Sequence, residues 1–277
     1  MDKNGEIKNL RMEKEYAELN RKLWNERTAI HYASSFYDVD SFIQGAEILN
    51  SIELDLLGDV NQKSLLHLQC HFGMDTIALA RKGAEVTGID LSDEAIKKAN
   101  ELKSQTQISA DFICCNVYDT LQFIRHQFDI VFTSYGVIGW LPDLNKWAEI
   151  IYSTLKPNGV FVLAEFHPMV WMFDNDFKKI QYSYFNKQVI FENEEGTYAD
   201  LTASIEQNTS VSWNHDLSEV INALIHAGFV LEVFNEYDYS PYNCFKHTIE
   251  PEKGKFRIQG LEEKIPMVYA LRVRKIH

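Results

Sequence analysis

The sequence predicts an α/β protein whose core is a doubly wound, mostly parallel sheet of seven strands. Three observations lead to this fold class. Apolar runs of strand length alternate with helical patterns between residues 64 and 166, as they do in strand–helix–strand units. A turn-rich interruption is followed by one more helix and strand. The last two apolar runs have no helix between them, so we expect the final strand to be antiparallel.

The order of these patterns divides the chain into three expected parts. Residues 1–60 read as helical and would form an N-terminal cap or lid. Residues 61–166 and 213–277 would form the sheet with its helices, and residues 167–212 an inserted antiparallel β segment after the fifth strand. The expected strands are SLLHLQ (64–69), AEVTGID (84–90), ISADFICCN (108–116), FDIVFTSY (128–135), VFVLAEF (160–166), VLEVFNEYDY (230–239) and PMVYALRVRK (266–275).

Local signals mark the ends of the intervening helices. Ser92 is the expected N-cap of a helix whose first turn carries Asp93 and Glu94, where the helix dipole favours negative charge. Gly83 and Gly228 follow two other helical patterns and can take the left-handed conformation that ends a helix.

Composition limits the classes of partner. The chain of 277 residues carries a net charge of −13, which repels a phosphate backbone, so we expect a small-molecule substrate and no nucleic acid. The basic cluster of Lys253, Lys255 and Arg257 reads as a solvated loop. No apolar run is long enough to span a bilayer, and the charged N-terminus lacks a signal-peptide core. We therefore expect a cytoplasmic protein without a membrane partner.

The stretch LLHLQCHFGMDT, which begins at Leu65, lies where the first strand gives way to a turn and a helix. In doubly wound sheets, ligands bind beyond the carboxyl ends of the strands, beside this turn. The stretch has one glycine, Gly73, and carries Gln69 and His71 where a nucleotide loop has glycines. The next strand ends at Asp90, at roughly the spacing of the ribose-binding acid in dinucleotide sites. Because Ser92 already caps the following helix, a ligand role for Asp90 is favoured.

Order, spacing and text resemble the class I S-adenosylmethionine-dependent methyltransferases, which have a seven-stranded Rossmann-like core. The motifs that carry the likeness are VTGIDLS, FICCNVYD, FDIVFTSYGVIGWLPDL and LKPNGVFVLAEF, all between Leu65 and Phe166. LLHLQCHFG stands where the family has an acid followed by three alternating glycines, and it is similar to a subgroup that reads HLQCHFG. The resemblance implies S-adenosylmethionine as the cofactor and methyl transfer as the reaction.

Carried over by position, the resemblance also implies a set of cofactor-binding residues. They are Gln69, Cys70, His71, Phe72, Gly73, Asp90, Leu91, Asn116, Val117, Ser134 and Tyr135. The first five would wrap the methionine end, the next two would hold the ribose and pack on the adenine, the following pair would bind the adenine edge, and the last pair would meet the methionine amine. His67 occupies the position of the family's acid, which puts the usual water-mediated hold on that amine in question.

Methyl transfer from a sulfonium depends mainly on in-line positioning and exclusion of water, and it needs a general base only when the acceptor must lose a proton. His167, just after the fifth strand, is the candidate base; a solvent-facing histidine is the alternative interpretation. Tyr135 is the second catalytic candidate, as a substrate contact. Tyr37, Trp24 and Trp140 are expected at the lid or substrate, because aromatic rings suit a sulfonium cation. The identity of the acceptor stays open, with a weak hint of an apolar or aromatic molecule.

Other interpretations compete with this one. His67, Cys70 and His71, with Cys114, are possible metal ligands, but their spacing matches no common metal motif, and we expect no metal. A nicotinamide-dependent oxidoreductase would share the strand–turn–acid unit but should have a GxGxxG loop. A non-catalytic protein that binds S-adenosylmethionine is the third possibility. The inserted segment would either cover the site or pair with a second copy, so a homodimer also stays open.

Overall fold

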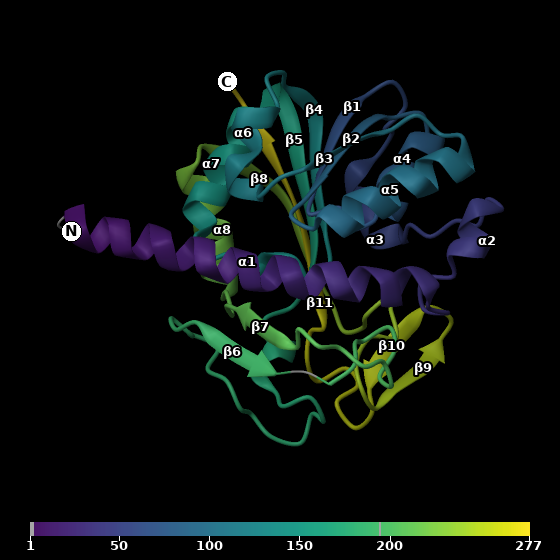
Figure 1. The fold of residues 1–277 in the computed structure, drawn as a ribbon, viewed down its shortest axis with the longest axis vertical. Helices are drawn as coiled ribbons and strands as arrows, with labels where there is room; N and C mark the ends of the chain where they lie inside the picture. Colours follow the sequence, from purple (N-terminus) through teal and green to yellow (C-terminus); the bar gives the residue numbers. More distant parts are fainter. Residues whose placement is uncertain (1–2, 194) are drawn as a thin grey trace.

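The computed structural model describes residues 3–193 and 195–277 and confirms the predicted α/β fold (Figure 1). Seven strands form one sheet in the order β3-β2-β1-β4-β5-β11-β8, and only β11 runs antiparallel to its neighbours. These strands are β1 (Ser64–Leu68), β2 (Glu85–Asp90), β3 (Asp111–Cys114), β4 (Phe128–Ser134), β5 (Leu155–Phe166), β8 (Phe229–Tyr237) and β11 (Val268–Lys275).

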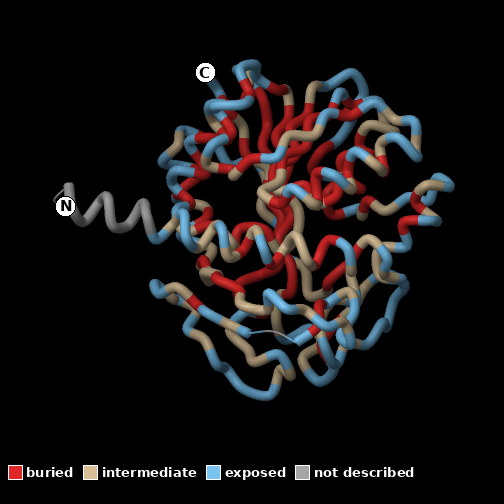
Figure 2. Tube along the Cα trace, in the orientation of Figure 1, coloured by how far each residue is buried: buried red, intermediate tan, exposed pale blue. Residues whose placement is uncertain are grey.

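Helices cover both faces of the sheet, and the buried residues form two apolar layers (Figure 2). Alternation along β1 shows how the sequence makes both layers. Leu65 packs with Ile77 on one side of the sheet, whereas Leu66 packs with Trp147 on the other. The helices are α1 (Lys3–Ala33), α2 (Val39–Ile43), α3 (Ser51–Leu57), α4 (Met74–Arg81), α5 (Asp93–Thr106), α6 (Thr120–Phe123), α7 (Leu144–Thr154) and α8 (Leu217–His226).

The predicted helix ends are confirmed. The Ser92 side chain accepts a hydrogen bond from the Ala95 N–H at 3.0 Å and so caps α5. Gly83, with φ of 93°, follows the end of α4, and Gly228, with φ of 103°, follows the end of α8.

Helix α1 crosses the molecule between the sheet and two small hairpins (Figure 1). Its side chains tie the two sides together. The carboxamide of Asn20 bonds to both the N–H and the C=O of Val211 in β7, at 3.0 and 2.7 Å. On the sheet side, Arg21 and Asn25 donate to Asp93 at the start of α5. Helix α1 therefore lies over the edge of the sheet at which β2 ends and α5 begins.

The structure modifies the sequence-based fold in two places. The insertion is largely irregular, and its only paired strands among the described residues are β6 (Ile190–Asn193) and β7 (Thr209–Ser212). Residues 248–258, predicted to be a solvated loop around the basic cluster, form a second hairpin of β9 (Thr248–Glu252) and β10 (Lys255–Ile258). Arg257 is buried there because its guanidinium pairs with Asp238 at 2.8 Å.

Candidate cofactor and acceptor site

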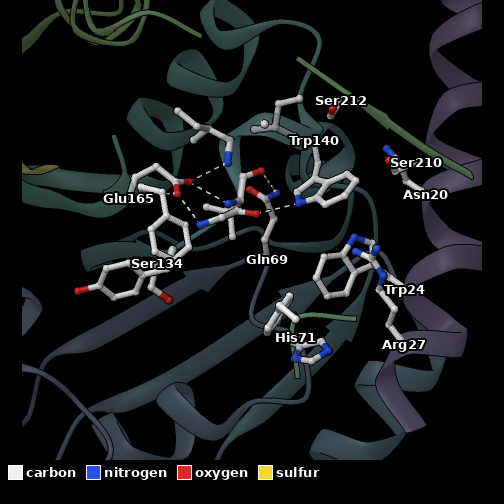
Figure 3. A pocket seen from close by; sticks show the side chains of 18 of the residues that line it. Asn20, Trp24, Arg27, Gln69, His71, Ser134, Trp140, Glu165, Ser210 and Ser212 are labelled. Carbon is white, nitrogen blue, oxygen red and sulfur yellow. Dashed lines mark hydrogen bonds between the residues drawn. The ribbon is translucent and has the colours of Figure 1, made fainter. Parts of the chain in front are cut away.

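A cavity of about 1080 Å³ lies beyond the carboxyl ends of the central strands, under α1 (Figure 3). Its wall is made by the turns after β1, β2, β3 and β4, by α1, by the insertion and by residues 241–246. The sequence-predicted residues that line it are Trp24, Tyr37, Gln69, Cys70, His71, Phe72, Gly73, Asp90, Leu91, Asn116, Val117, Ser134, Tyr135 and Trp140. Only one predicted site residue, His167, is absent from the wall.

The turn after β1 has the backbone shape of a three-glycine loop. Gln69, His71 and Gly73 have φ values of 55°, 52° and 80°, so every second residue lies in the left-handed region. These are the positions at which the resemblance places glycines, because glycine enters this region without steric cost. Gly73 is required for a second reason, since a Cβ there would lie 2.6 Å from the ring of Phe112.

Asp90 organises this turn from the end of β2. Its carboxylate accepts the N–H of His71 at 2.8 Å through one oxygen and the N–H of Ser92 at 2.8 Å through the other. Burial raises the pKa of Asp90 to about 6. Each oxygen keeps a lone pair, so the carboxylate can also accept hydroxyl donors from a ligand in the cavity.

Two polar atoms of the β1 turn are buried without a hydrogen-bond partner. They are Oε1 of Gln69 and Nε2 of His71. The Nε atom of Gln69 is already engaged, because it donates to the carbonyl of Val137 at 2.9 Å. Burial lowers the pKa of His71 to about 3, so the ring is neutral at physiological pH. Since buried polar atoms are normally paired, these two indicate a polar ligand against the turn.

The turn after β3 brings Asn116 to the cavity wall. Its side-chain oxygen accepts the N–H of Tyr118 at 3.0 Å and starts a short 3₁₀ turn over Val117–Asp119. Val117 is buried and Asn116 is half-buried. The amide NH₂ of Asn116 thus stays available to the cavity, in the place the resemblance assigns to the adenine.

The chain after β4 is held by a buried carboxylate that sequence reasoning missed. Glu165 in β5 accepts the backbone N–H groups of Gly136, Val137 and Ile138, and that of Phe166. The bonds from 137 and 138 measure 2.8 and 3.1 Å, and Glu165 is 1% exposed (Figure 3). This carboxylate fixes the segment whose carbonyl at Val137 receives the Gln69 side chain. A lone acid within the apolar strand VFVLAEF was the available signal.

Tyr135 joins the same segment to the N-terminal cap. Its hydroxyl donates to Glu53 of α3 at 2.8 Å. Glu53 also completes the capping box of α3 by accepting the N–H of Asn50 at 2.6 Å, and burial raises its pKa to about 7. Asn50 in turn donates to the hydroxyl of Tyr242, whose ring packs edge-on against Tyr135. Neither Glu53 nor Tyr242 was singled out from the sequence.

His167 has a structural environment and lies outside the cavity wall. It is 3% exposed, its Nε2 lies 2.9 Å from a carboxylate oxygen of Glu236, and its Nδ1 accepts the N–H of Met169 at 3.0 Å. Both ring nitrogens are therefore engaged within the protein. This geometry does not favour the predicted role of His167 as a base, and its burial also contradicts the alternative interpretation of a solvent-facing histidine. Tyr135, predicted as a substrate contact, lines the cavity.

Aromatic rings gather around the β1 turn. The ring centroid of Trp24 lies 5.3 Å from that of His71 and 5.5 Å from that of Trp140 (Figure 3). The ring centroid of Tyr37 lies 5.6 Å from that of His71 and 5.4 Å from that of His31. Burial lowers the pKa of His31 to about 2. Both histidines are neutral and offer aromatic faces, while the Arg27 guanidinium lies 5.4 Å from the Trp24 ring centroid and brings a positive charge to this wall.

A second aromatic group forms the far end of the cavity, away from the β1 turn. Phe245 packs against Phe166, Trp171 and Phe177 with centroid separations of 5.0, 5.7 and 5.8 Å. Trp171 and Phe177 belong to the insertion, and Phe245 follows β8, so the segments added to the sheet build this end. The four rings define what we call the aromatic chamber.

Among the described residues, no group of three or more His, Cys, Asp or Glu side chains is placed to hold a metal ion. No helix in that part of the chain has the length and apolar character needed to cross a bilayer.

Comparison with known proteins identifies relatives of this architecture. Residues 66–163 match a family model described as a methyltransferase domain. An uncharacterized methyltransferase of Synechocystis is 29% identical over 47% of this chain and 60% of its own length. A ubiquinone biosynthesis O-methyltransferase of Chromobacterium violaceum is 27% identical over 46% of this chain and 56% of its own. An uncharacterized RNA methyltransferase of Clostridium acetobutylicum is 31% identical over 44% and 28%. The matches thus span less than two thirds of these relatives.

Solved structures share the fold over most of the chain. An S-adenosylmethionine-dependent methyltransferase from Listeria monocytogenes matches with a TM-score of 0.55 and 20% identity, over 80% of this chain and 94% of that one. A geranyl diphosphate C-methyltransferase from Streptomyces coelicolor, in complex with S-adenosyl-L-homocysteine, matches with a TM-score of 0.53 and 14% identity, over 80% and 73%. Residues 66–163 thus match a methyltransferase domain, and the fold around them is shared with solved structures described as S-adenosylmethionine-dependent methyltransferases.

Proposed function

We propose that this protein transfers the methyl group of S-adenosylmethionine to a small apolar or aromatic acceptor bound in the aromatic chamber. The carrying observation is the shape of the cavity. It starts at the turns after β1, β2 and β3 and continues past Tyr135 to Phe166 and Phe245. A volume of about 1080 Å³ is at the upper end of ligand sites, so there is room for a cofactor and an acceptor together.

The residues present fit the cofactor. Asp90 would accept the ribose hydroxyls, and Leu91 with Asn116 would hold the adenine. Gln69 and His71 each bring a buried atom that lacks a partner to the methionine end. When bound, the cofactor supplies an electrophilic methyl group on a sulfonium. The other predicted cofactor contacts are Cys70, Phe72, Gly73, Val117, Ser134 and Tyr135. Trp24, Tyr37 and Trp140 would form the lid.

Tyr135 and Glu53 would receive a proton from an acceptor that carries a hydroxyl or amine. Tyr135 lines the cavity, and its hydroxyl donates to the Glu53 carboxylate at 2.8 Å. An acceptor O–H or N–H that donates to the tyrosine oxygen could pass its proton on to Glu53 as the new bond to the methyl carbon forms. A carboxyl whose pKa is about 7 suits this role near neutral pH.

The net charge of the whole protein favours a small molecule over RNA as the acceptor. The net charge of −13 opposes binding of a phosphate backbone. The one lysine of the 241–246 segment, Lys246, faces the carboxylate of Asp176 at 3.6 Å. The relative described as an RNA methyltransferase makes RNA the competing acceptor, so the assay must include it.

The experiment has two stages. Isothermal titration with S-adenosylmethionine and with NADH separates a methyltransferase from a nicotinamide-dependent oxidoreductase. Formation of S-adenosylhomocysteine is then measured with small phenols and quinols in one arm and with tRNA transcripts in the other. Turnover in the first arm alone supports the proposal. Turnover with RNA alone would replace the acceptor class, and binding without any turnover would indicate a non-catalytic cofactor-binding protein.

A further inference from the structure

The position of the family's acid, at the end of β1, holds no negative charge in this protein. His67 stands there, 2% exposed, and burial lowers its pKa to about 3. Its Nδ1 lies 2.8 Å from the hydroxyl of Thr76 and its Nε2 lies 3.4 Å from the hydroxyl of Ser134. A neutral histidine in this setting can orient its neighbours but cannot attract a cation.

The hydrogen-bond series that starts at His67 continues through Ser134 to the carboxylate of Asp75. Ser134 donates its hydroxyl hydrogen to the carboxylate of Asp75 at 3.2 Å. With that donor fixed, the network is consistent when Thr76 donates to Nδ1 of His67, Nε2–H of His67 donates to Ser134, and Ser134 donates to Asp75. Every donor therefore points toward Asp75, which is the single anion at the end of the series.

Asp75 is placed where the methionine end of the cofactor is expected. It is the second residue of α4, directly after the β1 turn, and it lines the cavity beside Gly73, Ser134 and Tyr135. The resemblance independently assigns Ser134 to the methionine amine. The position at the helix N-terminus also favours a carboxylate, because the helix dipole is positive there.

This carboxylate lacks a positive partner among the described residues, where no salt bridge to Asp75 is formed. Carboxylates withdrawn from water are normally paired with a cation. The ionisable groups that act on Asp75 or are acted on by it are acids and phenols: Glu47, Glu53, Tyr37, Tyr135 and Tyr242. Among the described residues, the polar side chain bonded to Asp75 is the neutral hydroxyl of Ser134 and not a cation. Oε1 of Gln69, buried and unpartnered on the same turn, is a second vacant acceptor.

We propose that Asp75 binds the α-ammonium group of S-adenosylmethionine and so takes over the role of the acid that is absent at position 67. The inference rests on the proposed function, in that it requires the cofactor to occupy this cavity. Within it, His67 and Ser134 act as positioning residues that direct the Asp75 carboxylate, and the Gln69 oxygen accepts a second hydrogen of the ammonium.

The test compares two ligands that differ in that ammonium. S-adenosylmethionine carries the amino acid group, whereas 5′-methylthioadenosine has the adenosine and sulfur without it. Isothermal titration is done with both ligands on the wild type, Asp75→Asn, Asp90→Asn and Asp111→Asn. Asp111 is the matched control, because its side chain is 83% exposed at the start of β3.

We expect Asp75→Asn to weaken S-adenosylmethionine binding about tenfold or more while affinity for methylthioadenosine changes less than about twofold. Retained methylthioadenosine binding also shows that the variant is folded. Asp90→Asn should weaken both ligands, and Asp111→Asn neither.

Three results would overturn the inference. If Asp75→Asn binds S-adenosylmethionine as the wild type does, or more tightly, the carboxylate does not face the ammonium. If it loses both ligands equally, Asp75 only supports the turn. If the wild type binds neither ligand, the proposed function itself fails. The first two results, in contrast, would refute the role of Asp75 and leave the proposed function intact.

Discussion

Replacing Glu165 by Gln tests whether one buried carboxylate holds the wall of the site. The carboxylate receives four backbone N–H groups, two on each oxygen: those of Gly136 and Phe166 on Oε1, and those of Val137 and Ile138 on Oε2. The amide of glutamine has one oxygen and one NH₂ group. Glu165→Gln therefore removes two of the four bonds and sets the NH₂ group against two other donors.

The magnitude follows from those bonds. Hydrogen bonds to a charged group contribute about 1.5–3 kcal/mol each, so losing two costs about 3–6 kcal/mol. Burial raises the pKa of Glu165, which shows that the charged carboxylate is costly to bury. A neutral amide costs less to bury, and this difference offsets part of the lost hydrogen-bond energy. We expect the free energy of unfolding to fall by about 2–4 kcal/mol, and Tm by about 5–15 °C.

Differential scanning calorimetry measures the change in Tm, and titration with S-adenosylmethionine measures its effect on the site. Affinity should fall as well, because Val137 provides the carbonyl that receives the Gln69 side chain at 2.9 Å. Glu149→Gln, on the exposed side of α7, is the matched control and should leave both quantities unchanged. A Glu165→Gln protein with wild-type Tm and wild-type affinity would refute the assignment of this carboxylate as the support of the wall.

Three further predictions concern the turn, the cofactor and the proton. Gly73→Ala should lower the free energy of unfolding by about 2–4 kcal/mol in urea denaturation, since it adds both left-handed strain and a clash, whereas Gly254→Ala, with φ of 72° and open space, should lose about 1 kcal/mol. Because burial raises the pKa of Asp75 and of Asp90 to about 6, each becomes a better acceptor as pH rises through 6; titration should show S-adenosylmethionine affinity increasing from about pH 5 to about pH 7, and methylthioadenosine affinity increasing less steeply. Once an acceptor is known, Glu53→Gln should slow turnover about 100-fold and abolish its rise with pH near 7, with cofactor affinity retained; an unchanged pH profile would exclude Glu53 as the proton acceptor.

The sheet could be predicted because its signals are local. Continuous apolar runs, the Ser92 cap and the glycines after α4 and α8 each depend on residues close in sequence, and all are found as expected. The hairpin of β9 and β10 was missed because β9 is polar and mostly exposed and β10 is only 4 residues long. Its one buried charge, Arg257, is stabilised by Asp238, 19 residues away, and a cluster of basic residues gives no sign of such a partner.

The site was predictable as a location but not as a set of charges. The strand-end rule identifies the turns after β1 to β4, and every residue assigned to them lines the cavity. The three carboxylates Asp75, Glu53 and Glu165 were missed. The partners of Glu165 in the chain after β4 lie 27 to 29 residues away, whereas the other two have ordinary local explanations in the sequence. Asp75 lies in a helix first turn and Glu53 in a capping box, while the tyrosine that bonds to Glu53 is 82 residues away. The division of the chain into cap, core and insertion stays a prediction.

The altered β1 turn accepts backbone strain at two positions and gains two side chains that line the cavity. Holding a residue other than glycine in the left-handed region costs about 1–2 kcal/mol, and the turn does so at Gln69 and His71. In return, the Gln69 side chain donates to the carbonyl of Val137, and the His71 ring packs with Trp24. Three glycines would make the same backbone without either side chain, and the wall would then lose the His71 ring that packs with Trp24. Loss of the glycines is therefore compatible with a working cofactor loop, because the φ values that the glycines serve are preserved.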